Sequence, residues 1–400
     1  MISIIDTVPL RRGSTSEIFV AIGLSIGAAV SLGFSRFAYA LLLPAMRESL
    51  HWTYVEAGGM NTANAVGYVI GAAAGAWFSK RLGIKTSFLV SLALSGQVLL
   101  LTGLVDSYNV LMLLRFIGGL TTAVTFVVGV SLAAGVAPDA SPARSSLLLA
   151  IYITGVGSGI VISGLLIPPI LAKLGASGWE HGWLYMGFIA ILAMVPAIAA
   201  TRAVPEQLSP DSGVLPMKEA AFLWPTFISY ALFGAGYVSY MTFIIVLIRQ
   251  SGSSALYAAG FWIVLGMASV IGTLLWGRVL TKMREGVGAG VVAIVVLFGT
   301  LPTLIWPSLS AAFVSAIIFG GSFMAGPTAV TVMVRKLLAP KIWTAAISAL
   351  TVAFAVGQAV GPLLSGYVSD MTGSVSAGLW ISPVLLIASA IAAVCQKARQ

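Results

Sequence analysis

The segment GVGSGIVISG at residues 155–164 has a partial copy, GQAVGPLLSG, at residues 357–366. Both segments lie inside long apolar runs, and both place glycine at the first and fifth positions and a Ser-Gly pair at the end. Glycine at four-residue spacing lets helix backbones approach closely within a membrane. The pair therefore predicts a tightly packed membrane helix that occurs once in each half of the chain.

Other positions repeat at nearly the same separation. Gly118–Gly119 matches Gly320–Gly321, Gly75 matches Gly277 and, with one extra residue, Gly33 matches Gly236. Matches that stay in register indicate a duplication, and parallel six-helix repeats are typical of one large class of transporters. We therefore expect one bundle over residues 1–201 and a second over residues 219–400, with a cytoplasmic linker at residues 202–218.

The composition excludes a water-soluble domain. Charged residues make up 8% of the chain and hydrophobic residues 59%, with a mean hydropathy of +1.03, whereas a soluble domain carries roughly a quarter of its residues as charged ones. One cysteine and two histidines leave no basis for a disulfide framework or for a metal or catalytic cluster. We expect no enzyme activity, no metal and no cofactor.

Apolar runs long enough to cross a bilayer as helices recur along the chain, and the fold class is therefore all-α and integral to the membrane. The twelve predicted spans are Ile18–Leu43, Val55–Phe78, Thr86–Val105, Val110–Ala134, Ser146–Leu171, Trp183–Thr201, Ala220–Ile248, Ala255–Trp276, Val287–Trp306, Ala311–Val334, Thr344–Val368 and Ala377–Val394.

The basic residues predict the orientation. If the N-terminus is cytoplasmic, the outward loops hold only Arg47, Lys173 and Arg249, and the other Lys and Arg residues of the loops face inward. This asymmetry satisfies the positive-inside rule and accounts for the net charge of +9 without nucleic acid as a partner. We expect a multi-pass protein of the inner membrane, surrounded by the lipid bilayer, with both termini in the cytoplasm.

Several motifs resemble the major facilitator superfamily. Arg81, Gly83 and Lys85 resemble the basic end of that family's signature loop between its second and third helices, although Lys80, or Ser79 in the other alignment, replaces the acidic residue of the loop. The run Arg115–Gly119 resembles the fourth-helix motif. The runs Gly33–Tyr39, Gly236–Phe243 and Gly357–Pro362 resemble the bacterial YbfB-type branch.

The resemblance implies two pseudo-symmetric six-helix bundles that rock around a central cavity, the motion called alternating access. Glycines that allow close packing also allow helices to slide. The residues expected to take part in this motion are Gly75, Lys80, Arg81, Gly83, Lys85, Gly155, Gly159, Gly357, Gly361 and Pro362.

Two arginines lie inside predicted spans. Burial of a charge at membrane depth costs at least ~2.5–3.5 kcal/mol, so such residues are candidates for function. Arg36 and Arg115 fall at similar depth, and the aligned positions in the second half are Ser239 and Ile317. We expect both to bind substrate. The alternatives are a structural or coupling role for Arg115 and a buried pair with Glu56 for Arg36.

Carboxylates are missing at that depth. Glu56 alone lies slightly inside a span, which makes it the candidate for coupling. Arginine offers paired donors to carboxylate or phosphate, so the pattern predicts an anionic solute. Polar side chains expected to complete the pocket are Tyr39, Asn61, Asn64, Tyr240, Thr242 and Gln358. For each of these the alternative is a hydrogen bond between helices, and we favour that alternative for Tyr240 and Tyr68.

The sequence contains no nucleotide-binding loop that would indicate direct ATP drive. We therefore expect a monomeric secondary transporter of a small organic anion, a carboxylate in kind. The alternative is an exporter of amphipathic, drug-like compounds with a loose apolar cavity, for which Phe126, Trp262, Phe323 and Met324 are candidates. Arg36→Ala distinguishes the two, because only an anion carrier should lose transport.

Overall fold

The computed structural model describes residues 14–205, 215–306 and 308–398, and within these ranges every regular element is a helix. The first half contains α1 (Ser14–Ala28), the π-helix η1 (Ala29–Phe37), α2 (Tyr39–Leu50), α3 (Tyr54–Leu82), α4 (Ile84–Thr102), α5 (Tyr108–Ala134), α6 (Pro142–Leu174), the 3₁₀ turn η2 (Gly175–Ser177), α7 (Gly178–Leu192) and α8 (Met194–Ala203).

The second half contains α9 (Met217–Phe222), α10 (Trp224–Gln250), α11 (Ala255–Leu280), α12 (Glu285–Ile305), α13 (Leu309–Phe323), α14 (Ala325–Leu337), the 3₁₀ turn η3 (Pro340–Ile342), α15 (Trp343–Thr372), α16 (Val375–Leu379) and α17 (Ile381–Val394). Part of the predicted linker, residues 206–214, lies outside the described residues, and the domain boundaries remain a prediction.

Each predicted span coincides with one helix or with two consecutive helices, except the first, which takes in α1, η1 and α2. By length and composition alone, ten helical stretches in the described residues could cross a membrane. This number is lower than twelve for two reasons. The stretch Ala143–Ala203 takes in two predicted spans, and α3, which carries Glu56, Asn61 and Asn64, is not among the ten.

Most interruptions of the spans have a common cause. The breaks at Ala193, Leu223, Met324 and Trp380 are each followed within three residues by a proline. Proline lacks an N–H group, and its ring clashes with the carbonyl of the preceding turn. The first span is different, because no proline lies near the start of η1. There the helix changes from α to π geometry, and this π-helix contains Arg36.

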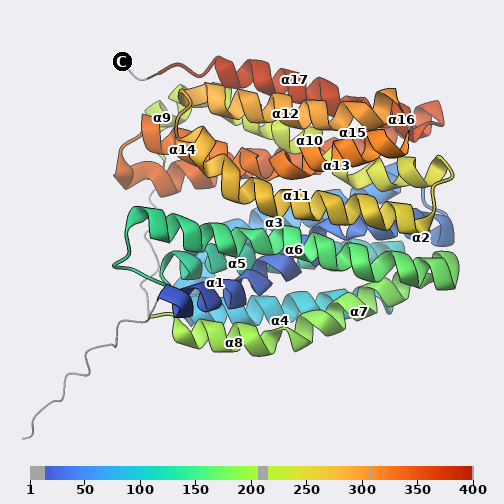
Figure 1. Cartoon of the computed structure of the whole chain (residues 1–400), viewed down its shortest axis with the longest axis horizontal. Helices are drawn as coiled ribbons and strands as arrows, with labels where there is room; N and C mark the ends of the chain where they lie inside the picture. The colour runs from blue at the N-terminus through green and yellow to red at the C-terminus, as the bar shows by residue number, and fades with distance from the viewer. Residues whose placement is uncertain (1–13, 206–214, 307, 399–400) are drawn as a thin grey trace, which may run out of the picture.

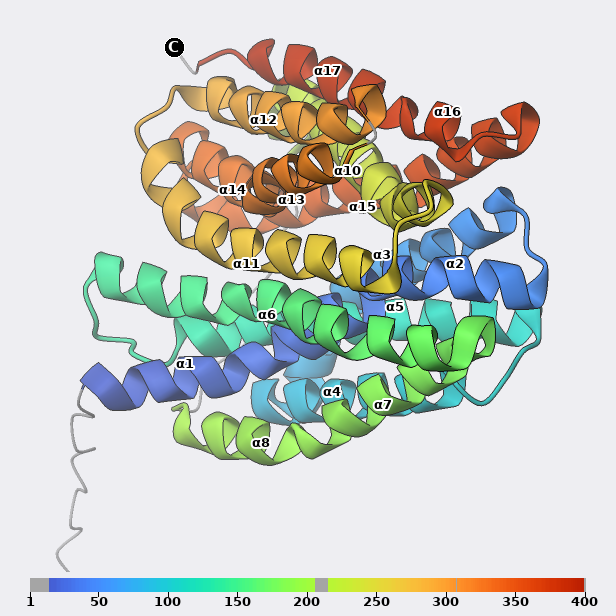
Figure 2. The ribbon, with the colours of Figure 1, turned by 45° about the vertical axis from the view of Figure 1, so that its right-hand side comes forward.

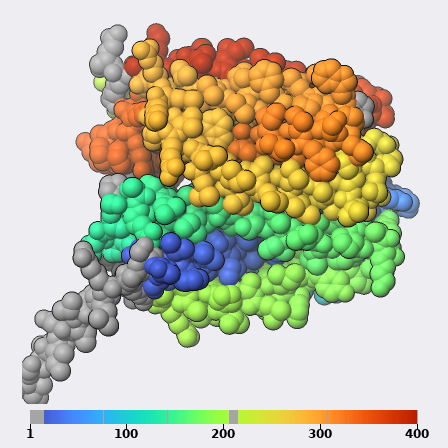
Figure 3. All heavy atoms as spheres, viewed as in Figure 1, coloured from blue at the N-terminus to red at the C-terminus, as the bar shows by residue number. Residues whose placement is uncertain are grey.

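The elements α1 to α8 lie together in the lower part of Figure 1, and α9 to α17 lie in the upper part. The two groups meet along α6 with α11, and along α3 with α15. Figure 2 shows α6 and α11 side by side at this boundary, and Figure 3 shows their atoms in contact along it.

Small residues permit this close approach. A Cβ atom at Gly157 of α6 would lie 2.7 Å from the carbonyl oxygen of Gly266 in α11. The indole Nε1 of Trp262 donates a hydrogen bond to Ser163 Oγ at 3.1 Å across the same boundary. Trp262 is thus fully buried between the helices and does not line a loose cavity.

Candidate functional site

Arg36 lies in the last turn of the π-helix η1 and is buried, with 7% of its surface exposed. Its Nη2 donates a hydrogen bond to Oε1 of Gln358 in α15 at 2.6 Å. Short π-helical segments are rare and frequently occur at functional sites. The guanidinium is thereby held at the boundary between the two halves.

Gln358 extends the contact deeper into the second half. Its Nε2 donates to the hydroxyl of Tyr237 in α10, and on the other side the guanidinium of Arg36 lies 5.1 Å from the ring centre of Tyr68 in α3. Guanidinium has five N–H donors. Among the described residues, Arg36 uses one of them, and its partner is a neutral amide. The remaining donors have no protein acceptor in this part of the chain.

Arg115 of α5 is held differently. Its Nη1 donates to the backbone carbonyl of Ser35 in η1, and its Nη2 donates to Asn61 Oδ1 at 3.0 Å. The guanidinium also lies over the rings of Tyr39, 4.7 Å from the ring centre, and Trp183, 5.7 Å away. Arg115 therefore ties the π-helix to α3 and α5, as the structural alternative for this residue requires.

Asn61 forms a second connection between the halves. Its Nδ2 donates to Thr242 Oγ1 of α10 at 2.7 Å, and Thr242 in turn donates to the carbonyl of Val238 at 2.6 Å. Arg115 thus reaches the second half through Asn61, whereas Arg36 reaches it through Gln358.

A small cavity lies between these two connections. It is lined by Arg36, Phe37, Ala40, Asn61, Val238, Met241 and Thr242. Its volume of about 10 Å³ is close to the minimum that one water molecule needs. The cavity therefore has no room for a larger solute in this conformation.

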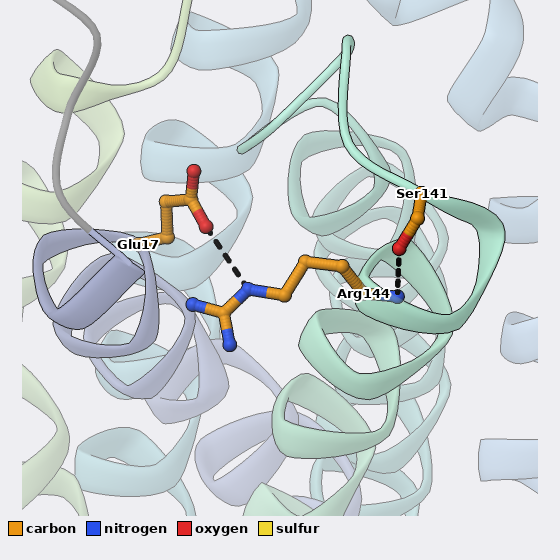
Figure 4. Close-up of polar contacts among 3 residues, drawn as sticks. All are labelled: Glu17, Ser141 and Arg144. Carbon is orange, nitrogen blue, oxygen red and sulfur yellow. Dashed lines mark hydrogen bonds and ion pairs between the residues drawn. The ribbon is translucent and has the colours of Figure 1, made fainter.

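Neither buried arginine is neutralised by a carboxylate within the described ranges. The ion pair Glu17–Arg144, at 3.0 Å, lies where α1 and α6 begin and involves neither buried arginine (Figure 4). Glu56 accepts from the backbone N–H of Thr53 at 2.8 Å in a capping box. The expected alternative of an Arg36–Glu56 pair is therefore wrong: the start of α3 holds that carboxylate. No group of three His, Cys, Asp or Glu side chains that could hold a metal occurs in the part of the chain described.

Three predicted pocket residues have hydrogen bonds elsewhere. The Tyr240 hydroxyl bonds with Thr303 and Ser315 inside the second half. Asn64 donates to the backbone carbonyl of Arg115 at 3.2 Å, and the Tyr39 hydroxyl donates to the carbonyl of Ala57 at 2.8 Å. These contacts between helices are the alternative that the sequence left open.

The repeated glycines pack equivalent helix pairs. Gly155 faces the carbonyl of Ser25 and Gly159 that of Ala29, where Cβ atoms would come within 2.1 and 2.5 Å. Gly357 and Gly361 face the carbonyls of Ala231 and Ala235 in the same way, at 1.8 and 2.3 Å. At each of the four glycines, two helix backbones thus cross at close range.

This packing corrects the predicted alignment of the first and seventh spans. Gly159 also contacts Gly33, and Gly361 also contacts Ser239, so Ser239 rather than Gly236 is the counterpart of Gly33. Three residues further along, Arg36 then corresponds to Thr242 rather than to Ser239. Both members of this pair line the small cavity.

The signature-like loop lies at the turn from α3 to α4. Lys80 and Arg81 are exposed in the last turn of α3, and Lys85 is half-buried at the start of α4. Gly83 joins the helices with φ of 81°, a conformation that glycine adopts without strain. Gly75 has room beside it, since a Cβ atom there would come no closer than 4.0 Å to Val124.

The halves are also joined at the end where α3 begins. The Asp370 carboxylate, from the last turns of α15, accepts hydrogen bonds from the backbone N–H groups of Tyr54 and Val55, both at 2.8 Å. Gln250 Nε2 donates to the Tyr54 hydroxyl at 2.7 Å. Close by, the carbonyl of Pro362 lies against Gly58.

Sequence reasoning missed two residues of this arrangement, Ser35 and Tyr237. Ser35 contributes a backbone carbonyl that the π-helix presents to Arg115, and nothing in the local sequence indicates that widening. Tyr237 follows Gly236 in a quoted motif, and its aromatic side chain beside a helix-packing glycine was the signal that could have identified it.

A helical bundle of two halves related as parallel repeats is the architecture of a transporter of the major facilitator superfamily. The sequence model of the family described as "Uncharacterised MFS-type transporter YbfB" matches residues 28–394, and the chain belongs to this family. The predicted family and fold class are thus confirmed.

Two relatives with similar sequences support this family assignment. The chain is 24% identical over 397 residues to the 3-(3-hydroxy-phenyl)propionate transporter of Escherichia coli strain K12, with 94% of this chain and 93% of that protein covered. It is 26% identical over 371 residues to the uncharacterized MFS-type transporter YceJ of Bacillus subtilis strain 168, covering 90% and 91%. These relatives are transporters, and this chain is not an enzyme.

Among solved structures, a bacterial homolog of the human lysosomal transporter Spinster, in an inward-facing and occupied conformation, aligns with a TM-score of 0.73. Its sequence is 16% identical, and the alignment covers 96% of both chains. At this identity the likeness establishes the fold alone.

Proposed function

We propose that this chain carries a small organic anion, a carboxylate in kind, across the membrane by alternating access as a secondary transporter. The observation that carries the proposal is Arg36: a buried guanidinium, 7% exposed, that faces the cavity between the halves and has one neutral hydrogen-bond partner.

The physical argument concerns the cost of that charge. A cation at membrane depth is unfavourable by at least ~2.5–3.5 kcal/mol and normally has a partner or a water-filled surrounding. A carboxylate would supply the missing negative charge and accept two parallel N–H bonds from the guanidinium fork. Gln358, whose amide oxygen accepts from Arg36, takes the place of one substrate oxygen while the site is empty.

Arg115 has a supporting role in this proposal. Its donors are directed to Ser35 and Asn61, so it positions η1 and Asn61, and Asn61 lines the cavity together with Thr242. We assign substrate contact to Arg36, Asn61 and Thr242, which line the cavity, while Gln358 holds the guanidinium of Arg36 in the empty site. Tyr240 and Asn64 are left to helix packing, and Glu56, which caps α3, receives no coupling role.

The relatives and the charge pattern support the remaining features. The relative from E. coli is named for transport of a propionate, which is a carboxylate. The basic residues favour cytoplasmic termini and the inner membrane by the positive-inside rule. We expect the transporter to act as a monomer, because each chain holds a complete pair of halves around its own cavity.

A second candidate, an exporter of amphipathic compounds, is favoured by one observation. Beside the cavity, Tyr237, Phe323 and Phe354 form a stack of aromatic rings. This stack offers a binding surface for the apolar part of a compound, whatever the charge of that compound. The two candidates differ in whether binding needs the cation.

The test compares carboxylates with their amides in a thermal-shift assay on the purified protein, since a ligand of the folded form raises the melting temperature. We expect acids to raise it and the matched amides not to. Arg36→Gln should remove the effect, and Arg36→Lys should retain part of it because the charge remains. Arg144→Gln, at the Glu17 pair far from the cavity, is the control and should respond like the native protein. Stabilisation by neutral amphipathic compounds that persists in Arg36→Gln would favour the exporter.

A further inference from the structure

Aromatic rings line the second half where it faces Arg36. Along α10, Tyr230, Phe233 and Tyr237 follow at intervals of three and four residues and so share one face of the helix. Phe354 of α15 stacks on Tyr230, with ring centres 4.3 Å apart, and on Tyr237 at 5.7 Å and 10° between planes. Phe323 of α13 stacks on Tyr237 at 5.8 Å. We call these five rings the aromatic wall.

A single side chain, that of Gln358, separates the aromatic wall from the guanidinium of Arg36. Gln358 accepts from Arg36 and donates to the hydroxyl of Tyr237. Phe37, the residue after Arg36, meets Phe323 edge to face, with ring centres 5.6 Å apart. The charge and the ring surface are therefore parts of one site, although they belong to opposite halves.

The first half supplies a further ring. Tyr68 of α3 lies under the guanidinium of Arg36, 5.1 Å from ring centre to carbon. When the halves separate, the gap that opens beside Arg36 has Tyr68 on one side and the aromatic wall on the other. A flat ring fits between two such surfaces in an offset-stacked arrangement, with centres 4.5–7 Å apart.

From this geometry we propose that the transported anion carries an aromatic ring: its carboxylate binds Arg36 and its ring stacks between Tyr68 and the aromatic wall. The inference rests on the proposed function, because it needs the anion to bind at Arg36. Ring pairs contribute beyond simple area burial, so an aromatic acid should bind about twofold to tenfold more tightly than a saturated acid of the same shape.

The experiment uses matched pairs of acids on the purified full-length protein. The pairs are benzoate with cyclohexanecarboxylate, phenylacetate with cyclohexylacetate, and 3-phenylpropionate with 3-cyclohexylpropionate, with dissociation constants measured by titration calorimetry. The saturated member of each pair is the more apolar one. A preference for the aromatic acid therefore reports stacking rather than general hydrophobicity.

Two variants locate the preference. Phe354→Leu should bring the two members of the best-bound pair to within about twofold, with the affinity for the saturated acid retained. Phe313→Leu is the control: Phe313 pairs edge to face with Tyr257, at 5.4 Å, between α11 and α13, outside the aromatic wall, and it should leave the preference unchanged. If Phe354→Leu does not fold, the acid pairs on the native protein still decide the question.

Three outcomes would count against these statements in different ways. Equal or tighter binding of the saturated acids overturns the aromatic inference and leaves the anion proposal intact. A preference that survives Phe354→Leu but is lost in Phe313→Leu overturns the placement of the ring and with it this inference. Failure of every acid to bind better than its amide overturns the proposed function itself.

Discussion

The carboxylate of Asp370 caps the first turn of α3 by accepting the backbone N–H of Tyr54 at 2.8 Å, from the opposite half of the molecule. The first N–H groups of a helix have no partner within the helix, and the helix dipole favours a negative charge at this point. Glu56 caps the same turn from within the first half. The start of α3 is therefore capped by two carboxylates. Glu56 belongs to the same half as α3, whereas Asp370 can cap it only while the two halves are in contact.

We expect Asp370→Asn to favour the state that is open at the start of α3. The charge-assisted hydrogen bonds at this exposed position contribute about 1 kcal/mol, or roughly a fivefold shift in the equilibrium between open and closed states. The measurement is the rate at which a water-soluble maleimide labels a cysteine at Thr62, whose hydroxyl donates to the carbonyl of Ala359 across the boundary. Cys395→Ser removes the native thiol, which is exposed.

The matched control for this measurement is Glu56→Gln. It removes a carboxylate from the same helix start without affecting a bond between the halves, so labelling at position 62 should stay near that of the parent. Equal acceleration by both variants would mean that Asp370 acts through the stability of α3 and not by holding the halves together.

Gln358→Glu should abolish binding of the anion. The new carboxylate would lie where the amide oxygen now accepts from Arg36 at 2.6 Å, and it would neutralise the charge and occupy the donors that the solute needs. We expect the dissociation constant to rise by at least about tenfold, as measured by calorimetry. Gln358→Met, which removes the partner without adding charge, should change it by less than about threefold. Unchanged affinity in Gln358→Glu would show that the solute binds elsewhere.

Replacement of the two arginines should affect folding stability unequally. Arg115→Gln would leave the carbonyl of Ser35 and the amide of Asn61 without their buried donor, at a cost of at least about 2 kcal/mol. Arg36→Gln removes one hydrogen bond but also relieves the burial of a charge that has no carboxylate partner among the described residues, so it should cost about 1 kcal/mol at most. Unfolding in mixed micelles gives both values, and a larger loss for Arg36→Gln would contradict the supporting role assigned to Arg115.

The repeated glycines should differ in their tolerance of alanine. At Gly357 a Cβ atom would lie 1.8 Å from the carbonyl oxygen of Ala231, so Gly357→Ala forces two helices apart and should destabilise the fold by about 1–3 kcal/mol. At Gly75 the nearest atom would be 4.0 Å away, so Gly75→Ala should be neutral or stabilising by about 0.5–1 kcal/mol. The same unfolding assay compares them. If Gly75→Ala keeps its stability but loses transport, the predicted gating role of Gly75 is supported.

The sequence alone was sufficient for the class of protein and its general build. The length of an apolar run is a local property, so the spans could be located from residues that are neighbours in the chain. The glycine repeat showed that the two halves carry packing glycines at corresponding positions. The scarcity of carboxylates near Arg36 and Arg115 was also visible, because it depends on composition and not on contacts.

Only the tertiary structure could decide what each buried polar group contacts. Arg36 and Gln358 are 322 residues apart in the chain, and Asp370 lies 316 residues from Tyr54. The structure also separated the two arginines, since Arg115 binds the Ser35 carbonyl that the π-helix presents. The physical reason is that a hydrogen bond depends on a few tenths of an ångström and on direction. These are set by how whole helices pack, while hydropathy is set residue by residue along the chain.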